Sequence, residues 1–394
     1  MNNNTHIIGA YNTKFGVLKD ETIYSLYAEV AKGAINDAGI DIADIDAVFL
    51  GNYSGGNFNN QEHIAPFGVN ILPELRFKPM YRVENACASG TSAVHMAEMA
   101  IKSGKAKKVL VVGVEKMNSL DTKNTAITLA KASYWEKEGA NGYNTFPGLF
   151  AEYAKGWMKH YGYSLEQLQK YLAEISAKAY SFGAQNPLAH LQKTRSKIDI
   201  LNLPNEKNPI IADPLRLHDC SLISDGAAAV ILSAEKTNNS VEIAATSSAS
   251  DYLNIVDSKR SNYFLDGASE ATKKALKQAK MTINDIQIAE VHDCFTITEL
   301  LIYSAIGLTK KGNEFEALLN KDVYLGGKCV VNPSGGLKSK GHPVGATGVS
   351  MHALLHKQLT NNAIGVQVNN ANAALVLNIG GSGATNMVSI LKRS

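Results

Sequence analysis

One cysteine of this chain stands among small residues in the stretch ENACASGTS, residues 84–92. A free cysteine is most often a small buried hydrophobic residue. Cys87 directly precedes a helical pattern, however, and the free N–H groups and dipole of a helix N-terminus lower the pKa of a thiol. The thiolate is the form that attacks an electrophile. Cys87 is therefore either a structural thiol or a nucleophile, and its setting favours the nucleophile.

A histidine occupies the corresponding place before a second helical pattern, in NPSGGLKSKGHPVGATG, residues 332–348. The glycines allow tight turns and close backbone packing. Taken alone, His342 is an ordinary loop histidine at a helix start. A cysteine with a nearby histidine is the arrangement that an activated thiol needs. The sequence therefore predicts that Cys87 and His342 face one cleft.

Three polar residues abruptly follow an apolar strand in AEVHDCF, residues 289–295. Ligands bind beyond the carboxyl ends of strands in open α/β sheets. We interpret Asp293 as a turn residue. Cys294 is either a buried thiol or, beside His292, a thiol that transfers a proton.

A glycine-rich turn, NIGGSGAT, follows another apolar strand at residues 378–385. Alone it fits a plain turn or a phosphate loop, and together with a nucleophile it offers backbone N–H groups to an oxyanion. The other cysteines and several histidines lack such a context and are expected to be structural or on the surface: Cys220, Cys329, His63, His95, His160 and His352.

An internal duplication positions these residues. Residues 33–52 align without a gap with residues 274–293, each as a helix end, a short turn with an aspartate and an apolar strand. The segments that begin at Cys87 and His342 form a second pair, each leading into a helix and then an apolar strand. Strands that alternate with helices predict sheets covered by helices. The chain thus contains two copies of one α/β unit, with Cys87 and His342 at the same place in each.

A different stretch separates the two copies. Residues 119–208 are rich in Tyr, Asn, Lys and Gln, and we expect an inserted, mostly helical lobe there. The predicted division is a first half (1–118 with 209–240), the insert 119–208, and a second half (241–394).

The composition limits the classes of function. A formal net charge of +3 over 394 residues argues against nucleic acid and membrane surfaces as partners, although it suits an anionic small molecule. Four widely spaced cysteines without a CxxC pair predict neither a zinc site nor a disulfide framework. No signal peptide or bilayer-spanning apolar run is visible, so we expect a cytoplasmic protein without membrane insertion.

Together, these four stretches resemble the thiolase superfamily over essentially the whole chain, and VHDCF is typical of its sterol-carrier-protein-type branch. ENACASGTS resembles the nucleophile motif, and residues 332–348 resemble the histidine motif. The resemblance implies a duplicated α/β fold of five layers, α-β-α-β-α, with a helical loop domain inserted in the first half. It also implies a homodimer or homotetramer, coenzyme A thioester substrates, and no permanently bound cofactor or metal.

The resemblance implies a role for each matching residue. Cys87 would carry the acyl group, and His342 would activate it and help to hold the thioester oxygen of the second substrate. His292 would support that oxyanion site. The backbone N–H groups of Cys87 and Gly380 would form the other oxyanion hole, and Ser221 matches a position near the pantetheine arm of coenzyme A.

One position departs from the pattern of most thiolases. Asn378 stands where they carry a second catalytic cysteine, and in the HDCF branch Cys294 takes that acid/base role. The implied reaction transfers an acyl group from acyl-CoA to Cys87, and an acetyl-CoA enolate then attacks it to give a 3-ketoacyl-CoA. Thiolytic cleavage is the reverse.

Two other functions stay open at this point. One is an acyltransferase that acts on a non-CoA acceptor together with a partner, such as a small zinc-ribbon protein. The other is a non-catalytic thiolase-like scaffold or acyl-CoA binder. A decarboxylating ketoacyl synthase fits less well, because those enzymes use other partners for the nucleophile.

Overall fold

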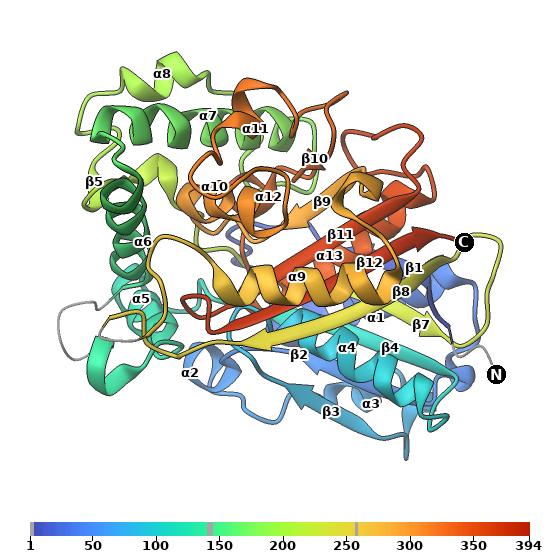
Figure 1. Ribbon diagram of the computed structural model, residues 1–394. Coiled ribbons are helices and arrows are strands. Elements are labelled where there is room, and N and C mark those ends of the chain that lie inside the picture. Colours follow the sequence, from blue (N-terminus) through green and yellow to red (C-terminus); the bar gives the residue numbers. More distant parts are fainter. Residues whose placement is uncertain (1–3, 140–144, 257–258) are drawn as a thin grey trace.

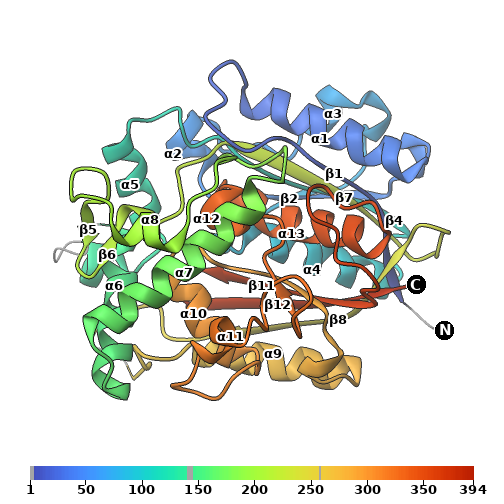
Figure 2. The same ribbon diagram turned by 90° about the horizontal axis from the view of Figure 1, so that it is seen from above.

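The computed structural model describes residues 4–139, 145–256 and 259–394, and these residues are arranged in five layers. Figure 2 shows α1 (Ile23–Ala38) and α3 (Phe67–Ile71) outside one stretch of sheet, and α9 (Asp266–Ala279) outside the other. The helices α4 (Ser89–Lys102) and α13 (Val344–Leu359) fill the central layer. The predicted α-β-α-β-α order is confirmed.

Hydrogen bonds join the main strands into one ten-stranded sheet with the order β10-β9-β11-β12-β8-β1-β7-β4-β2-β3. A short antiparallel ladder between β1 and β8 connects the two halves of this sheet (Figure 1). The strands are β1 (Thr5–Asn12), β2 (Ala47–Gly51), β3 (Met80–Val83), β4 (Lys108–Glu115), β7 (Gly226–Ser233), β8 (Val241–Ser250), β9 (Ile288–Val291), β10 (Val330–Val331), β11 (Ala373–Gly380) and β12 (Thr385–Arg393).

The two halves repeat the same topology. The orders β3-β2-β4-β7-β1 and β10-β9-β11-β12-β8 each combine parallel pairs with antiparallel ones at equivalent places. The gap-free alignment also holds in the backbone, because α1 and α9 end at the aligned residues Gly39 and Lys280, with φ of 63° and 56°. Short 3-10 turns then follow at Ile42–Asp44 and Ile283–Asp285. The predicted duplication is confirmed.

Glycines allow the two central helices to approach each other closely. A Cβ atom added to Gly90 would lie 2.8 Å from the Val349 nitrogen, and one added to Gly348 would lie 2.2 Å from the Thr91 nitrogen. Side chains at these positions would therefore push α4 and α13 apart. Because α4 begins two residues after Cys87 and α13 two residues after His342, this contact brings the two helix starts together.

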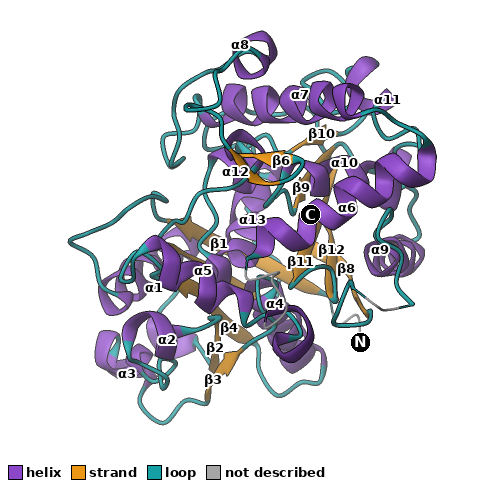
Figure 3. Cartoon of the chain, turned by 90° about the vertical axis from the view of Figure 1, so that its left-hand side faces the viewer, coloured by secondary structure: helices purple, strands orange, loops and turns teal. Residues whose placement is uncertain are grey.

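The predicted insert, residues 119–208, is mostly helical where it is described, with loops such as residues 184–196 between its helices; residues 140–144 lie outside the described residues. Its helix α6 covers the ends of β9 and β11, because Phe150 stacks on Phe295 at 4.7 Å and the Tyr153 hydroxyl donates to the Ser382 carbonyl at 3.0 Å. Figure 3 looks onto this side, with α5 and α6 in front of the strands. The domain boundaries themselves stay a prediction. The helices of the insert are α5 (Thr122–Ala130), α6 (Phe146–Tyr161), α7 (Leu165–Gly183) and α8 (Lys197–Leu201).

The remaining elements are short connections. They are the helices α2 (Gly55–Asn59), α10 (Thr296–Ala305), α11 (Glu316–Leu319) and α12 (Gly336–Ser339), and the strand pair β5 (Ile210–Ala212) and β6 (Leu215–Arg216). Among the described helices, none has the length and apolar character needed to cross a membrane.

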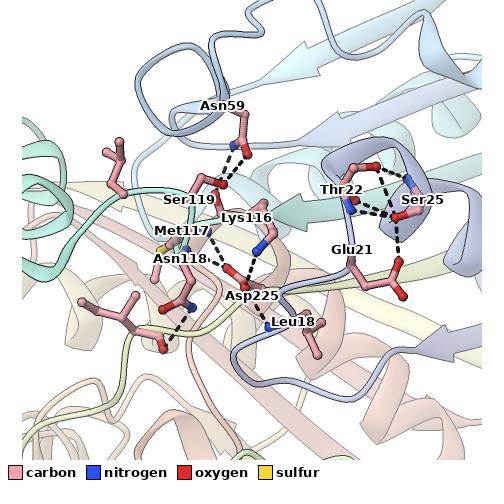
Figure 4. A network of polar contacts seen from close by, with 12 residues as sticks. Leu18, Glu21, Thr22, Ser25, Asn59, Lys116, Met117, Asn118, Ser119 and Asp225 are labelled. Atoms are coloured by element: carbon pink, nitrogen blue, oxygen red, sulfur yellow. Dashed lines mark hydrogen bonds and ion pairs between the residues drawn. The ribbon is translucent and has the colours of Figure 1, made fainter.

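A buried aspartate ties three loops of the first half together (Figure 4). The Asp225 carboxylate accepts from the backbone nitrogens of Leu18, Met117 and Asn118 at 3.0, 2.7 and 2.8 Å. It also pairs with the Lys116 ammonium at 2.8 Å, and both side chains are buried. Asp225 therefore holds the loop after β4 in place.

A second buried polar group lies in the central layer. The Ser389 hydroxyl contacts Nε2 of His95 at 2.9 Å and Nε2 of His352 at 2.8 Å. Burial lowers the pKa of His95 to about 3 and that of His352 to about 4. Both imidazoles are therefore neutral in the folded protein at neutral pH. Of the two expected places for these histidines, structural or on the surface, the structure shows the first, because both are buried in the core.

We expect the His95–His352 pair to make stability depend on pH. Below about pH 6.5, His95 and His352 bind protons in the unfolded chain, where their pKa values are ordinary, but not in the folded chain. Stability is then complete above pH 6.5 and falls as the pH drops toward 4, by about 1.4 kcal/mol per pH unit for each group. Urea unfolding of wild type and His352→Leu at several pH values measures this, and the variant should show a shallower fall. The exposed His63→Gln is the control, and equal slopes in all three proteins would contradict the prediction.

We also expect Asp225→Ala to lower the free energy of unfolding by about 3–5 kcal/mol, because it leaves the Lys116 charge buried and unpaired. Urea denaturation checks this. The matched control is Glu166→Gln, which breaks the exposed Glu166–Lys170 pair at 2.7 Å and should leave stability unchanged. A loss in Asp225→Ala no larger than in the control would show that the buried pair is not needed.

Candidate active site

Cys87 lies in a tight loop between β3 and α4. The preceding Ala86 has a φ of 51°, a left-handed conformation that is costly for a residue with a Cβ atom. The Ser89 hydroxyl maintains it by accepting from the Asn85 nitrogen at 2.9 Å and donating to the Ala86 carbonyl at 2.6 Å. The loop thus fixes a partly exposed Cys87 just before α4.

The electrostatic setting of Cys87 differs from the prediction. Burial raises the pKa of its thiol to about 12, and the Glu115 carboxylate adds to this. The backbone N–H groups of Gly381 and of Cys87 itself lower the pKa, but desolvation outweighs them. The helix start was expected to lower the pKa of Cys87, and this expectation is wrong, because the net shift is upward. The thiol needs a neighbouring base to become a nucleophile.

His342 is oriented as such a base. Its Nδ1 lies 2.7 Å from the Thr347 hydroxyl, and that hydroxyl donates its own proton to the Pro343 carbonyl at 3.0 Å. Thr347 must then accept from Nδ1–H, which leaves a lone pair on Nε2. Burial lowers the pKa of His342 well below its usual value, and the nearby His292 and Lys340 lower it further. His342 is therefore neutral, with an unprotonated Nε2.

His292 lies directly after β9 and is fully buried. Its ring meets that of His342 edge to face, with centroids 5.1 Å apart. The Nδ1 atom is 3.1 Å from the carboxamide nitrogen of Asn378. Burial lowers the pKa of His292 to about 3, so this ring is neutral too.

The structure brings three predicted site residues together. The Sγ of Cys87 and ring nitrogens of His292 and His342 all lie within 4.8 Å of one another. Both Nε2 atoms are buried and have no hydrogen-bond partner among the described residues. Unpartnered buried polar atoms are costly, and their presence here indicates a place for a ligand. A thiol and two imidazoles are also ligand types that soft metals prefer, although the sequence predicted no metal site.

Cys294 lies deeper than Cys87, with its Sγ 3.9 Å from the Thr298 hydroxyl. Burial raises the pKa of its thiol well above the usual value, and the nearby Cys87 would raise it further as a thiolate. It lies outside the three-residue cluster. The predicted Ser221 lies beside it, because the Ser221 nitrogen donates to the Cys294 carbonyl at 2.9 Å.

Asp293, interpreted from the sequence as a turn residue, lies in the connection between β9 and α10, where it also holds a second loop. It is fully buried, and its carboxylate accepts from the backbone nitrogens of Leu337 at 2.6 Å and Lys338 at 3.3 Å. These residues begin the segment that leads to His342. Asp293 therefore links the loop of His292 and Cys294 to the loop of His342. A carboxylate shortly after a short strand was the only sequence signal.

The predicted Gly380 lies at the end of β11, against the Cys87 loop. A Cβ atom on it would lie 2.4 Å from the Asn85 carbonyl oxygen, so only glycine fits there. The N–H group that stabilises the Cys87 thiolate belongs to the next residue, Gly381. A cavity of about 390 Å³ opens beside this loop, and its lining includes Asn85, Ala86, Gly380 and Gly381.

Sequence reasoning missed Glu115, a buried residue that ends β4. Its carboxylate accepts from the backbone nitrogens of Tyr53 at 2.8 Å and Gly345 at 3.0 Å, and from the Asn52 side chain at 3.0 Å. Burial raises the pKa of Glu115 to about 7. It joins the first half of the chain to the start of α13, three residues after His342.

The chain matches known families and proteins over nearly its whole length. Residues 5–236 match the family "Thiolase, N-terminal domain" and residues 247–393 match "Thiolase C-terminal domain-like". An acetyl-CoA acetyltransferase of Methanothermobacter thermautotrophicus is 39% identical over 98% of this chain and 99% of its own length. Human sterol carrier protein 2 is 32% identical over 96% of this chain and 70% of its own length.

Solved structures show the same fold. One of them, the "Ltp2-ChsH2(DUF35) aldolase", has a TM-score of 0.83 at 20% identity, covering 99% of this chain and 98% of that one. An acetyl-CoA acetyltransferase of Syntrophomonas wolfei has a TM-score of 0.74 at 19% identity, with both chains fully covered. With both family domains matched in order and a relative 39% identical along its full length, the chain belongs to the thiolase family.

Proposed function

We propose that this chain is an acetyl-CoA C-acyltransferase that makes or cleaves 3-ketoacyl-CoA, such as acetoacetyl-CoA, through an acyl-cysteine at Cys87. The observation that carries the proposal is the cluster of Cys87, His292 and His342. Their ligand atoms lie within 4.8 Å of one another, and neither histidine Nε2 has a hydrogen-bond partner in the part of the chain that the structure describes. A thiol beside a neutral imidazole lone pair is the arrangement for nucleophilic catalysis on a thioester.

In the first half-reaction, the high pKa of Cys87 requires that proton transfer accompanies attack. Nε2 of His342 takes the Sγ proton as sulfur attacks the thioester carbonyl. Backbone N–H groups at Cys87 and at the Gly380–Gly381 turn stabilise the resulting oxyanion. The tetrahedral intermediate expels the CoA thiolate, which takes the proton from His342. The acyl group then remains on Cys87.

In the second half-reaction, acetyl-CoA places its thioester oxygen beside His292. Cys294 acts here in its thiolate form and takes a proton from the α-carbon to give the enolate. The enolate attacks the acyl-cysteine carbonyl and forms the new carbon–carbon bond. Collapse of the tetrahedral intermediate breaks the bond between that carbonyl carbon and Sγ of Cys87, and the released Cys87 thiolate takes the proton from Cys294. In the direction of thiolysis, Cys294 donates the proton. Its raised pKa keeps the thiol protonated and so suits that direction.

The relatives support this function. Archaeal relatives that are 39% and 37% identical over 98% of this chain are named acetyl-CoA acetyltransferase. Coenzyme A thioesters are accordingly the proposed substrates, and a homodimer or homotetramer in the cytoplasm is the proposed form. One structural neighbour, the Ltp2-ChsH2(DUF35) aldolase, has DUF35 in its name. The alternative that this chain needs a small partner protein for its activity therefore stays open.

Mass spectrometry after incubation with acetyl-CoA tests the proposal. We expect one acetyl group on the Cys87 peptide, lost when free CoA is added, because the half-reaction is reversible. The Cys87→Ala variant should remain unmodified, and a matched Cys220→Ala variant should be acetylated like the wild type, since Cys220 lies outside the cluster.

The other outcomes distinguish the alternatives. An unmodified Cys87 that becomes acetylated only with a co-purified partner would replace the proposal with the partner-dependent acyltransferase. Binding of CoA without acetylation under any condition would indicate a non-catalytic binder. Acetylation followed by acetoacetyl-CoA formation from acetyl-CoA alone would establish the complete reaction.

A further inference from the structure

Asn378 stands where the resemblance to thiolases implies a second cysteine, and its side chain is fully buried between two elements of the site. The Thr91 hydroxyl on α4 donates to its carbonyl oxygen Oδ1 at 2.9 Å. Its amide nitrogen Nδ2 lies 3.1 Å from Nδ1 of His292. The chain of contacts therefore runs from Thr91 through Asn378 to His292.

The direction of these hydrogen bonds determines where His292 carries its proton. Because Thr91 donates to Oδ1, the amide group of Asn378 presents its NH2 to the imidazole. An NH2 group can only donate, so Nδ1 of His292 must accept. A neutral imidazole that accepts at Nδ1 carries its proton on Nε2. The unpartnered Nε2–H of His292 then points into the cluster as a donor.

His342 has the opposite tautomer. Its Nδ1–H is donated to Thr347, which leaves a lone pair on Nε2. The two neutral imidazoles, whose Nε2 atoms are both unpartnered, therefore offer one donor and one base. A thioester oxygen needs the donor, whereas the Cys87 thiol needs the base.

We propose that Asn378 is a positioning residue that holds His292 in its Nε2–H form, so that His292 donates a hydrogen bond to the substrate oxygen while His342 acts as the base. The substrate part of this inference rests on the proposed function. The tautomer itself does not, because it follows from the contacts of Thr91, Asn378 and His292.

The contact between Asn378 and His292 also determines whether the cluster can bind a metal. Cys87, His292 and His342 have the spacing of a metal site, but a ring nitrogen that carries a proton has no lone pair for a metal. A carboxylate in place of the amide would accept Nδ1–H and leave Nε2 free, which is the usual arrangement behind a zinc-bound histidine. Replacing the carboxamide at position 378 with a carboxylate should thus convert Nε2 of His292 from a hydrogen-bond donor into a metal ligand.

The test is 15N NMR of histidine-labelled wild type and Asn378→Asp, with the His292 signals assigned from a His292→Gln variant. We expect the proton of His292 on Nε2 in the wild type and on Nδ1 in Asn378→Asp. His352 is the internal control, because its Nδ1 lies 2.7 Å from the Gly348 carbonyl and stays protonated in both proteins. A wild-type His292 with its proton on Nδ1 would overturn the proposal.

A zinc titration with a chromophoric chelator gives a second readout that a merely structural role would not change. Asn378→Asp should bind Zn²⁺ about 10- to 100-fold more tightly than the wild type, and the gain should vanish in Asn378→Asp/Cys87→Ala. Equal affinities of Asn378→Asp and the wild type would contradict the proposal.

Kinetics connect the tautomer to the reaction. Asn378→Leu removes the donor without adding charge, and it should lower kcat for acetoacetyl-CoA formation by about 100-fold, the effect of losing one oxyanion donor. The rate of Cys87 acetylation by acetyl-CoA, which depends on His342, should fall by less than about 10-fold in the same variant. Equal losses in both steps would overturn the assigned role. A wild type without thiolase activity but with the expected NMR signals would refute the proposed function and leave the tautomer assignment intact.

Discussion

The close packing of α4 against α13 is the constraint on which the site depends. Gly90 and Gly348 let the two helix backbones meet with no room for a side chain between them. Each helix belongs to one copy of the duplicated unit, and each begins two residues after a reactive group, Cys87 in one case and His342 in the other. Two residues that are far apart in the chain therefore share one cleft. Buried carboxylates stabilise this arrangement, since Glu115 reaches Gly345 and Asp293 reaches Leu337.

The two histidines of the resulting cleft are buried, and this burial determines its chemistry. Desolvation favours neutral forms, so the Cys87 thiol keeps its proton and both histidines remain uncharged. Burial thus disfavours an ion pair of thiolate and imidazolium. Catalysis then depends on where protons and lone pairs point. Thr347 orients His342 as an acceptor of the thiol proton, and Asn378 orients His292 as a donor toward the substrate.

The sequence predicted the parts of the structure that follow from local pattern. Apolar strands, helix starts and the gap-free alignment of two segments were enough for the duplication, the layer order and the meeting of Cys87 with His342. Polar residues that act through distant contacts were beyond such reasoning. Asp293 resembled a turn residue because its partner Leu337 lies far along the chain, and Glu115 was missed for the same reason. The pKa of Cys87 was predicted with the wrong sign because burial, which outweighs the helix start, is a property of the folded protein.

The pH dependence of Cys87 alkylation by iodoacetamide, compared between wild type and His342→Ala, tests the activation of the thiol most directly. If Nε2 of His342 accepts the Sγ proton, wild-type Cys87 reacts at neutral pH, and the variant is slower by about 100-fold, the typical effect of losing a general base. The variant should regain reactivity only at high pH, where the thiol ionises without help. Equal rates across the pH range would show that Cys87 is activated without His342, and would contradict the site described above.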